Sequence, residues 1–261
     1  MTNKSLVDEL IEDKEIDQTI IKTFYLKDDL SSDIFNKEGN SYIMIEGVRD
    51  KLLNVANAFI DYLNIDFFVY DVVLTGSLAN FNWCDYSDVD LHIIVDFDEV
   101  GDGDKSPKFK TIVKEFFDSK KDNWNRTHNI KIKQYDVELY VQDSSEKHLS
   151  SGVYSVLNNK WLVEPVQGKQ GIDDNLILSK GEEYATLIDN LDEKSKSGED
   201  VTAQIDDVKD KLKKFRQSGL ESSGEFSYEN LTFKLLRRNG YIEKLLNLKR
   251  SVVDKKLSVT Q

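Results

Sequence analysis

Three features that are scarce or missing in this sequence narrow what the protein can be. It has a single cysteine, Cys84, among 261 residues, which excludes an internal disulfide and a zinc site built from cysteines. No run of about 18 apolar residues occurs, so a membrane-spanning helix is not expected. No secretory signal is visible either, and with its lone thiol the chain is typical of a reducing compartment, so we expect a cytoplasmic protein.

Net positive charge is also missing. The 48 acidic residues outnumber the 35 basic ones and leave a formal charge of −13 at pH 7. A protein that grips nucleic acid with its whole surface needs positive charge along that surface, so this class is excluded, although a local basic patch is not. What the chain does have is aromatic residues, with 13 Phe, 11 Tyr and 3 Trp, which excludes a disordered polymer.

Hydrophobic spacing predicts mixed helices and strands in the first two thirds of the chain and helices in the last third. A helix is predicted over 45–64 and another from about Pro107, which suits a first helical position. The predicted strands cover 67–74, 88–95, 129–133 and 135–142, followed by a hairpin of 153–157 and 160–164 around a two-residue Asn158-Asn159 turn. Helices are predicted over 175–191, over 201–216 and after Ser227, the last interrupted near Asn239-Gly240.

These elements predict an α/β (α+β) fold with a small mixed sheet and helices on one side of it. We expect short helices in an N-terminal extension over 1–40, among them the apolar residues Leu6, Leu10 and Ile11. An α/β domain is expected over 41–170 and a C-terminal helical domain over 171–261.

The segment that carries chemistry joins a Gly-Ser turn to a pair of aspartates. Gly76-Ser77 follows one predicted strand, and Asp88 and Asp90 open the next. Residues i and i+2 of a strand point to the same side, so these two carboxylates can share a pair of hard divalent cations such as Mg²⁺. Glu138, or Asp136 as second choice, would supply a third carboxylate from a neighbouring strand. Gly76 and Ser77 offer backbone N–H groups and a hydroxyl to a phosphate chain.

This order of a strand, Gly-Ser, a spacer of about ten residues, Asp-x-Asp and a later acidic strand residue resembles the DNA polymerase β-type nucleotidyltransferase superfamily. More narrowly, LTGSLANFNWCDYSDVDLHIIVDF, VELYVQD and GVYSVLNNKW are similar to uncharacterised nucleotidyltransferase-like proteins of tailed bacteriophages, and so is NLTFKLLRRNGYIEKL. The similarity covers roughly residues 40–165. The third acid is Glu here, whereas Asp is common among polymerases.

The resemblance implies a polymerase β-like catalytic domain over 41–170 that moves a nucleoside monophosphate from a nucleoside triphosphate to a hydroxyl. Asp88, Asp90 and Glu138 would be the catalytic residues and would hold two Mg²⁺ ions, with Mn²⁺ as a substitute. The acceptor stays open between an RNA end, a small molecule and a protein, including a host tRNA or protein modified by a toxin. The alternative is a nucleotidyltransferase-like module that binds without turnover.

The last helical segment is basic in an otherwise acidic chain. Residues 231–256 hold eight basic and two acidic residues, a local charge of +6. Lys234, Arg237 and Arg238 are therefore candidates for binding a triphosphate or an RNA backbone, and a solvated helix face is the equal alternative.

Other polar and aromatic residues near the motif either contact the substrate or have a structural role. His92 shares the face of the two aspartates, where it either contacts substrate or is a hydrogen-bonded structural histidine. Asn80, Asn82 and Trp83 lie between the motif halves, and Tyr154 and Trp161 either stack on a base or pack in the core.

Overall fold

The computed structural model describes residues 16–101, 106–147, 150–167 and 171–259, and its contacts divide the chain into two compact units. The α/β unit is Tyr25–Lys169, and the helical unit combines Met1–Phe24 with Gln170–Gln261. Each unit has its own hydrophobic core. None of the helices in the described residues is long and apolar enough to cross a membrane.

The α/β unit is built on a mixed six-stranded sheet with the order β5-β6-β4-β3-β7-β8. Its strands are β3 (Val69–Thr75), β4 (Val89–Val95), β5 (Lys131–Ile132), β6 (Tyr135–Asp143), β7 (Val153–Ser155) and β8 (Lys160–Val163). Strands β4 and β6 run parallel, and every other neighbouring pair is antiparallel. A parallel pair needs a long crossover, which here contains α2 (Pro107–Thr127). The predicted small mixed sheet is thus confirmed.

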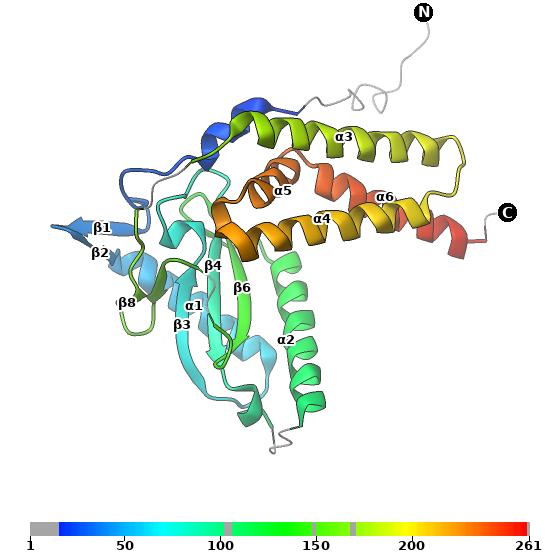
Figure 1. Ribbon diagram of the computed structural model, residues 1–261. Helices are drawn as coiled ribbons and strands as arrows, with labels where there is room; N and C mark the ends of the chain where they lie inside the picture. The colour runs from blue at the N-terminus through cyan, green and yellow to red at the C-terminus, as the bar shows by residue number, and fades with distance from the viewer. Residues whose placement is uncertain (1–15, 102–105, 148–149, 168–170, 260–261) are drawn as a thin grey trace, which may run out of the picture. The chain divides into compact units, whose positions relative to one another are not determined.

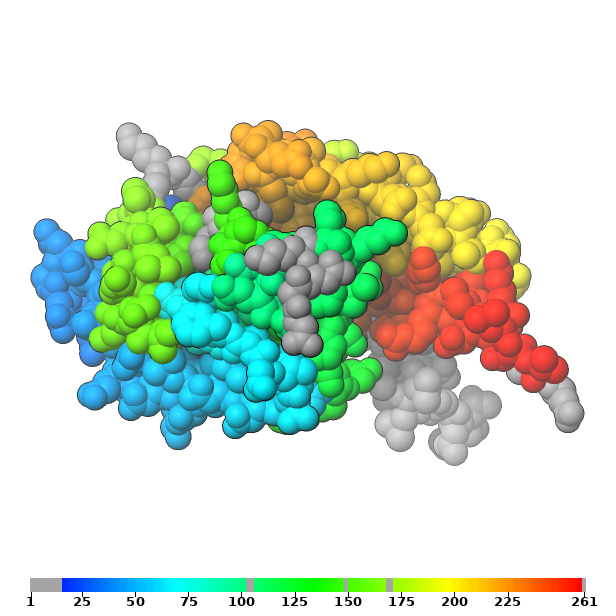
Figure 2. All heavy atoms as spheres, turned by 90° about the horizontal axis from the view of Figure 1, so that it is seen from below, coloured from blue at the N-terminus to red at the C-terminus, as the bar shows by residue number. Residues whose placement is uncertain are grey.

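Helices α1 (Glu46–Leu63) and α2 cover one face of this sheet (Figure 1). The alternation in β4 buries Val89, Leu91, Ile93 and Val95 against them, and leaves Asp90 and His92 on the other face. Seen from below, the residues that lead into β3 lie beside α2 (Figure 2), where Phe67 and Phe117 meet with ring centroids 5.7 Å apart.

Local signals explain where these helices begin and end. The hydroxyl of Ser106 accepts a hydrogen bond from the Phe109 N–H, and Pro107 occupies the first turn of α2. Helix α1 ends at Asn64, which adopts a left-handed conformation with φ 51°.

At one edge of the sheet a side chain binds the backbone of β6. Strand β5 pairs with only the first residues of β6, and further along the same edge the Asn125 carboxamide of α2 takes the place of a strand. Its Nδ2 donates to the Leu139 carbonyl at 3.1 Å, and its Oδ1 accepts from the Leu139 N–H at 3.2 Å. The pair of bonds satisfies backbone groups that an edge strand leaves open.

The N-terminal part of the α/β unit differs from the prediction. Residues 35–44 form a two-stranded hairpin, β1 (Phe35–Glu38) with β2 (Ser41–Met44), instead of helix. Most of their side chains are exposed or half-buried, so the hydrophobic alternation typical of strands is weak. The later hairpin also differs, because β7 stops at Ser155 and four residues connect it to β8 rather than two.

The helical unit consists of α3 (Asp174–Lys196), α4 (Thr202–Ser223), α5 (Tyr228–Arg238) and α6 (Tyr241–Leu257), with short 3₁₀ segments η2 (Gln18–Phe24) and η5 (Gly224–Phe226). The predicted interruption at Asn239-Gly240 is confirmed, since Gly240 has φ 81° between α5 and α6. The C-terminal part is therefore helical as predicted.

The predicted extension over 1–40 is not one piece in the described chain. Ile20, Ile21 and Phe24 of η2 pack against Ile177, Leu231 and Leu235 of the helical unit. Leu30, Ile34 and Phe35 are buried in the α/β core instead. Residues 1–15, including the helix expected around Leu6, Leu10 and Ile11, lie outside the described residues.

Candidate functional site

The open face of the sheet gathers the predicted acidic residues. In the strand register Asp90 is the partner of Thr75 on β3 and of Glu138 on β6. Neighbouring residues in register point to the same face, so the end of β3, the start of β4 and β6 present their polar side chains together. Asp88, Asp90 and Glu138 are each half-buried.

Gly76 shapes the backbone next to Asp90. It has φ 71° and ψ −160°, a conformation that side chains with a Cβ avoid. A Cβ placed on Gly76 would lie 1.7 Å from Asp90 Oδ2, so only glycine lets the carboxylate lie against this turn. The Gly-Ser turn and the Asp-x-Asp strand are therefore one spatial unit.

The Gly-Ser turn does not open an α-helix. Ser77–Ala79 is a single 3₁₀ turn, η3, and the Ser77 hydroxyl donates to the Ser87 hydroxyl at 2.8 Å. The buried Asn80 side chain stabilises the turn. Its Nδ2 donates to the Gly76 carbonyl at 2.6 Å, and its Oδ1 accepts from the Ser151 hydroxyl at 2.8 Å.

Tyr140 lies two residues after Glu138 on β6 and binds its carboxylate. Its hydroxyl donates to Glu138 Oε2 at 2.5 Å. Burial raises the pKa of Tyr140 above its ordinary value, and the hydrogen bond to Glu138 raises it further. The charges of Asp90 and Asp88 raise this pKa too, so the hydroxyl stays protonated.

His92 has the hydrogen bond expected of a structural histidine and also lines the pocket beside Asp90. Its ring stacks on Tyr140 with centroids 4.8 Å apart, and its Nδ1 is 2.8 Å from Gln142 Oε1. The ammonium of Lys121 lies 4.8 Å from the centroid of the Tyr140 ring, so α2 brings a cation to this face. A pocket of about 370 Å³ extends along these side chains; it is lined by Thr75, Gly76, Asp90, His92, Tyr140, Gln142, Glu146, Lys147 and Ser150.

Glu138 and Asp136, the two candidates for the third carboxylate, lie in different environments. Glu138 is opposite Asp90, whereas Asp136 is exposed and pairs with Lys131 at 2.8 Å on β5. Both residues share one face of β6, but only Glu138 receives the Tyr140 hydrogen bond. We therefore keep Glu138 as the candidate.

The donors suit Mg²⁺ in type, because carboxylate oxygens are the ligands that this hard cation prefers. The Asp90 carboxylate lies directly against Gly76, at the place a Cβ would fill. As the side chains stand, however, the described residues contain no group of three or more His, Cys, Asp or Glu that could hold a metal ion. The residue types thus fit a magnesium site. Binding of the ion would draw the carboxylates together.

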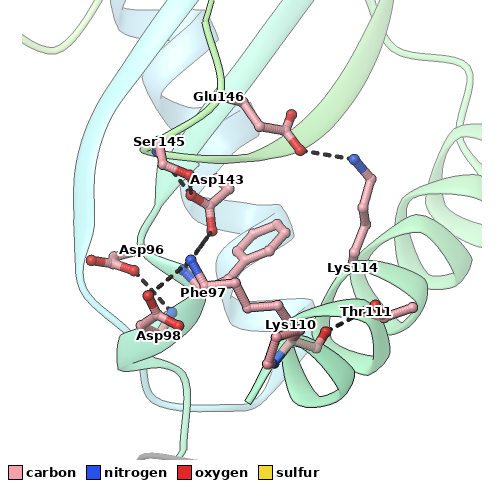
Figure 3. Close-up of polar contacts among 10 residues, drawn as sticks. Asp96, Phe97, Asp98, Lys110, Thr111, Lys114, Asp143, Ser145 and Glu146 are labelled. Carbon is pink, nitrogen blue, oxygen red and sulfur yellow. Dashed lines mark hydrogen bonds and ion pairs between the residues drawn. The ribbon is translucent and has the colours of Figure 1, made fainter. Parts of the chain in front are cut away.

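A second carboxylate cluster at the far ends of β4 and β6 is structural (Figure 3). The buried Asp143 accepts hydrogen bonds from the Phe97 N–H at 3.2 Å and from the Ser145 N–H at 2.8 Å. Burial by itself would raise the pKa of Asp143, but the Ser145 and Phe97 bonds and the Lys110 charge hold it below its ordinary value.

The basic candidates lie in the helical unit and have different surroundings. The Arg238 guanidinium donates to the Thr23 hydroxyl and lies 4.9 Å from the centroid of the Phe24 ring, so it ties η2 to α5. Arg237 is exposed. Neither Lys234 nor Arg237 has a carboxylate within ion-pair distance among the described residues.

Lys234 belongs to a group of cations that also includes Arg216 of α4. Burial lowers the pKa of Lys234; Glu225 opposes this, and the charges of the neighbouring arginines lower it further. Burial and the charge of Arg237 likewise lower the pKa of Arg216, whose Nε donates to Asn230 Oδ1 at 3.1 Å. Such crowding of like charges is what a bound anion would relieve.

Sequence reasoning missed Tyr140, Asn80 as a turn support, Arg216 and Gly152. A Cβ on Gly152 would meet the Ala79 carbonyl at 2.1 Å, so this glycine permits a close approach of two loops. Only Tyr140 had a visible signal, its place two residues after Glu138 on the same face of a strand. The aromatic residues Tyr154 and Trp161 pack in the core, with Tyr154 fully buried and their rings 4.9 Å apart.

Comparisons with known proteins add little. No family model and no curated protein matches the chain. One similar solved structure is a STING-associated CdnE c-di-GMP synthase from Capnocytophaga granulosa, with 14% identity, 82% of this chain and 83% of that chain covered, and a TM-score of 0.22. At this TM-score the likeness assigns neither fold nor activity to this chain.

Proposed function

We propose that this protein is a nucleotidyltransferase that moves a nucleoside monophosphate from a nucleoside triphosphate to a hydroxyl acceptor and releases pyrophosphate. The observation that carries the proposal is the register of three strands, which sets Asp90 beside both the Gly-Ser turn and Glu138. The sequence resemblance to the polymerase β-type superfamily adds to it, since the same motifs are the ones that meet in space.

In this proposal Asp88, Asp90 and Glu138 hold two Mg²⁺ ions, or Mn²⁺ in their place. These ions supply charge neutralisation at the reacting phosphate. The acceptor oxygen attacks the α-phosphorus, the bond from that phosphorus to the bridging oxygen of the β-phosphate breaks, and the electron pair leaves with pyrophosphate. Glu138 takes the acceptor proton, and the Tyr140 hydrogen bond fixes which of its oxygens does so.

The chain's remaining candidates are proposed to bind the phosphates. Gly76 and Ser77 lie at the turn beside Asp90, where their backbone N–H groups would meet an anion, and the Ser77 hydroxyl would exchange its bond to Ser87 for one to the phosphate. Lys234 and Arg237 carry positive charge that no described carboxylate neutralises at close range. Arg238 stays in the proposal as a nucleotide-binding residue with a second, structural contact to η2.

The test is transfer of label from each α-labelled nucleoside triphosphate, with Mg²⁺ or Mn²⁺, into RNA, protein and small-molecule fractions. We expect one fraction to be labelled by the wild type and none by Asp88→Asn, Asp90→Asn or Glu138→Gln. Asp85→Asn is the matched control, because Asp85 is exposed and lies in the loop that precedes β4. Equal labelling by the Asp90→Asn and Asp85→Asn variants would refute the assignment.

The second candidate, a module that binds nucleotide without turnover, makes a different prediction for the same experiment. It is favoured by the carboxylates' failure to form a metal-holding group as they stand. Nucleotide binding with no labelled fraction would support it, and labelling of any fraction would exclude it.

A further inference from the structure

A groove on the helix-covered side of the α/β unit is separate from the acidic face. Helix α1, the end of α2 and the β5–β6 turn enclose about 640 Å³. No residue that lines this groove also lines the pocket around Asp90. Its apolar wall is made of Ile45, Val48, Val55, Trp124, Ile130 and Ile132.

The groove exists because α1 presents small side chains there. Gly47, Asn54 and Ala58 are spaced by seven and four residues, which places them along one side of the helix. A Cβ on Gly47 would meet nothing within 4 Å. The large apolar residues of α1, such as Leu52 and Phe59, are buried in the core instead. The wall is therefore partly open, because Ile45, Val55 and Ile130 are half-buried while Val48, Trp124 and Ile132 are buried.

The rim of the groove is basic in a chain whose net charge is −13. Lys51, Lys131 and Lys133 all line it. Lys131 pairs with Asp136 at 2.8 Å, but neither Lys51 nor Lys133 has a carboxylate within ion-pair distance in the described part of the chain. This charge complements a negatively charged ligand.

One end of the groove is aromatic. The exposed ring of His128 stacks on Trp124, with centroids 3.9 Å apart and planes inclined by 21°. Flat rings next to an apolar wall favour a flat apolar ligand, and the groove's volume is within the range of about 300–1,000 Å³ typical of small-molecule sites.

We propose that this groove binds a planar aromatic anion. The ring system lies on the apolar wall beside Trp124 and His128, and the negative group meets the ammonium groups of Lys51 and Lys133. This site does not depend on the proposed transfer reaction, because it shares no residue with the acidic face.

Two matched dyes test the proposal on the full-length protein: the anionic 1-anilinonaphthalene-8-sulfonate and the neutral N-phenyl-1-naphthylamine, which lacks only the sulfonate. We expect saturable binding of the anionic dye to one site. Gly47→Leu fills the groove from an open position and should weaken binding of both dyes about tenfold or more. Its control is Gly171→Leu, because a Cβ at Gly171 also meets nothing within 4 Å.

The charge of the rim is tested separately. Lys51→Gln with Lys133→Asn should weaken binding of the anionic dye about threefold to tenfold at low ionic strength and leave the neutral dye unchanged. Asparagine is chosen at 133 because that position has φ 56°. Lys213→Gln with Lys214→Gln removes the same charge from the exposed surface of α4 and should change nothing.

Three results would overturn the proposal. They are the absence of saturable dye binding to the wild type, unchanged affinity in Gly47→Leu, and equal loss of both dyes in the double lysine variant. Sedimentation of the wild type and Gly47→Leu accompanies the dyes: a change of oligomeric state with unchanged dye binding would identify a second copy as the occupant and refute the small-molecule site.

Discussion

At the scale of single residues, Tyr140 shows how one side chain sets the chemistry of another. Its hydroxyl stays protonated, because its pKa is raised by burial and by the nearby carboxylates, so it donates to Glu138 throughout the neutral pH range. A carboxylate held at one oxygen keeps the other oxygen in a fixed direction. Partners of this kind orient metal ligands and acid–base groups without touching the substrate.

We predict that Tyr140→Phe lowers nucleotide transfer about 10-fold to 100-fold and weakens Mn²⁺ binding, because Glu138 loses its fixed donor. Electron paramagnetic resonance of Mn²⁺ reports the second effect even in the absence of an acceptor. Tyr70→Phe is the control, since Tyr70 also donates to a glutamate, Glu99 at 2.8 Å, but is 44% exposed. Unchanged Mn²⁺ affinity in Tyr140→Phe would contradict the positioning role.

The site residues that could be predicted are those that lie close together in the sequence. Gly76, Ser77, Asp88 and Asp90 stand within 15 residues of one another, and period-two alternation assigns the acids to one face. The roles of Asn80 and Gly152 could not be predicted, because each residue contacts a loop that is distant in the sequence. His128 and Trp124 form their stack at a helix end whose residue types predict no ligand.

At the scale of elements, the ends of β4 and β6 are locked by Asp143. This carboxylate joins the β6 terminus to the Phe97 N–H after β4, and only 6% of its side chain is exposed. Its lowered pKa means that the ionised form favours the folded state. The stability it contributes is complete above the unfolded-state pKa of about 3.9 and is lost as the pH falls through the lower folded-state value.

We predict that Asp143→Asn lowers the free energy of unfolding by about 1–3 kcal/mol at neutral pH, because charge-assisted hydrogen bonds to Ser145 and Phe97 are lost. The difference from the wild type should shrink below about pH 3, where the wild-type carboxyl is protonated as well. Urea unfolding at a series of pH values measures it, with Asp61→Asn on the exposed face of α1 as control. A difference that does not vary with pH would show that the ionised form is not the stabilising one.

Elements with strong periodicity were predictable, and short polar ones were not. The apolar stripes of α1 and α2 and the alternation of β4 led to the observed helices and strand within a few residues. Strands β1 and β2 were missed because four-residue strands with mostly solvated side chains carry no period. The order of strands in the sheet was also beyond the sequence, since it depends on which edges pair rather than on local pattern.

At the scale of the whole molecule, the chain enters the helical unit twice. Residues 16–24 pack with segments more than 150 positions away, while the intervening residues build the α/β unit. Phe24 is the last buried residue of this first pass, and Tyr25 begins the α/β unit. The helical unit therefore has a discontinuous sequence that a single boundary could not describe.

We predict that Phe24→Ala destabilises the helical unit by about 3–5 kcal/mol, because it empties a buried site and removes the ring beneath Arg238. Hydrogen exchange should accelerate in α3 and α5 and stay unchanged in β3, β4 and β6. Tyr25→Ala is the neighbouring control, since Tyr25 is 43% exposed. Uniform acceleration over both units would mean that the chain unfolds as one cooperative body.

The Asn125 carboxamide on the edge of β6 has a consequence for how molecules of this protein meet each other. An uncovered edge offers alternating donors and acceptors to any extended segment, and such templates lead to fibrils. By binding both backbone groups of Leu139, Asn125 occupies that template with a group that cannot propagate. The side chain thus blocks the addition of a further strand at this position of the edge.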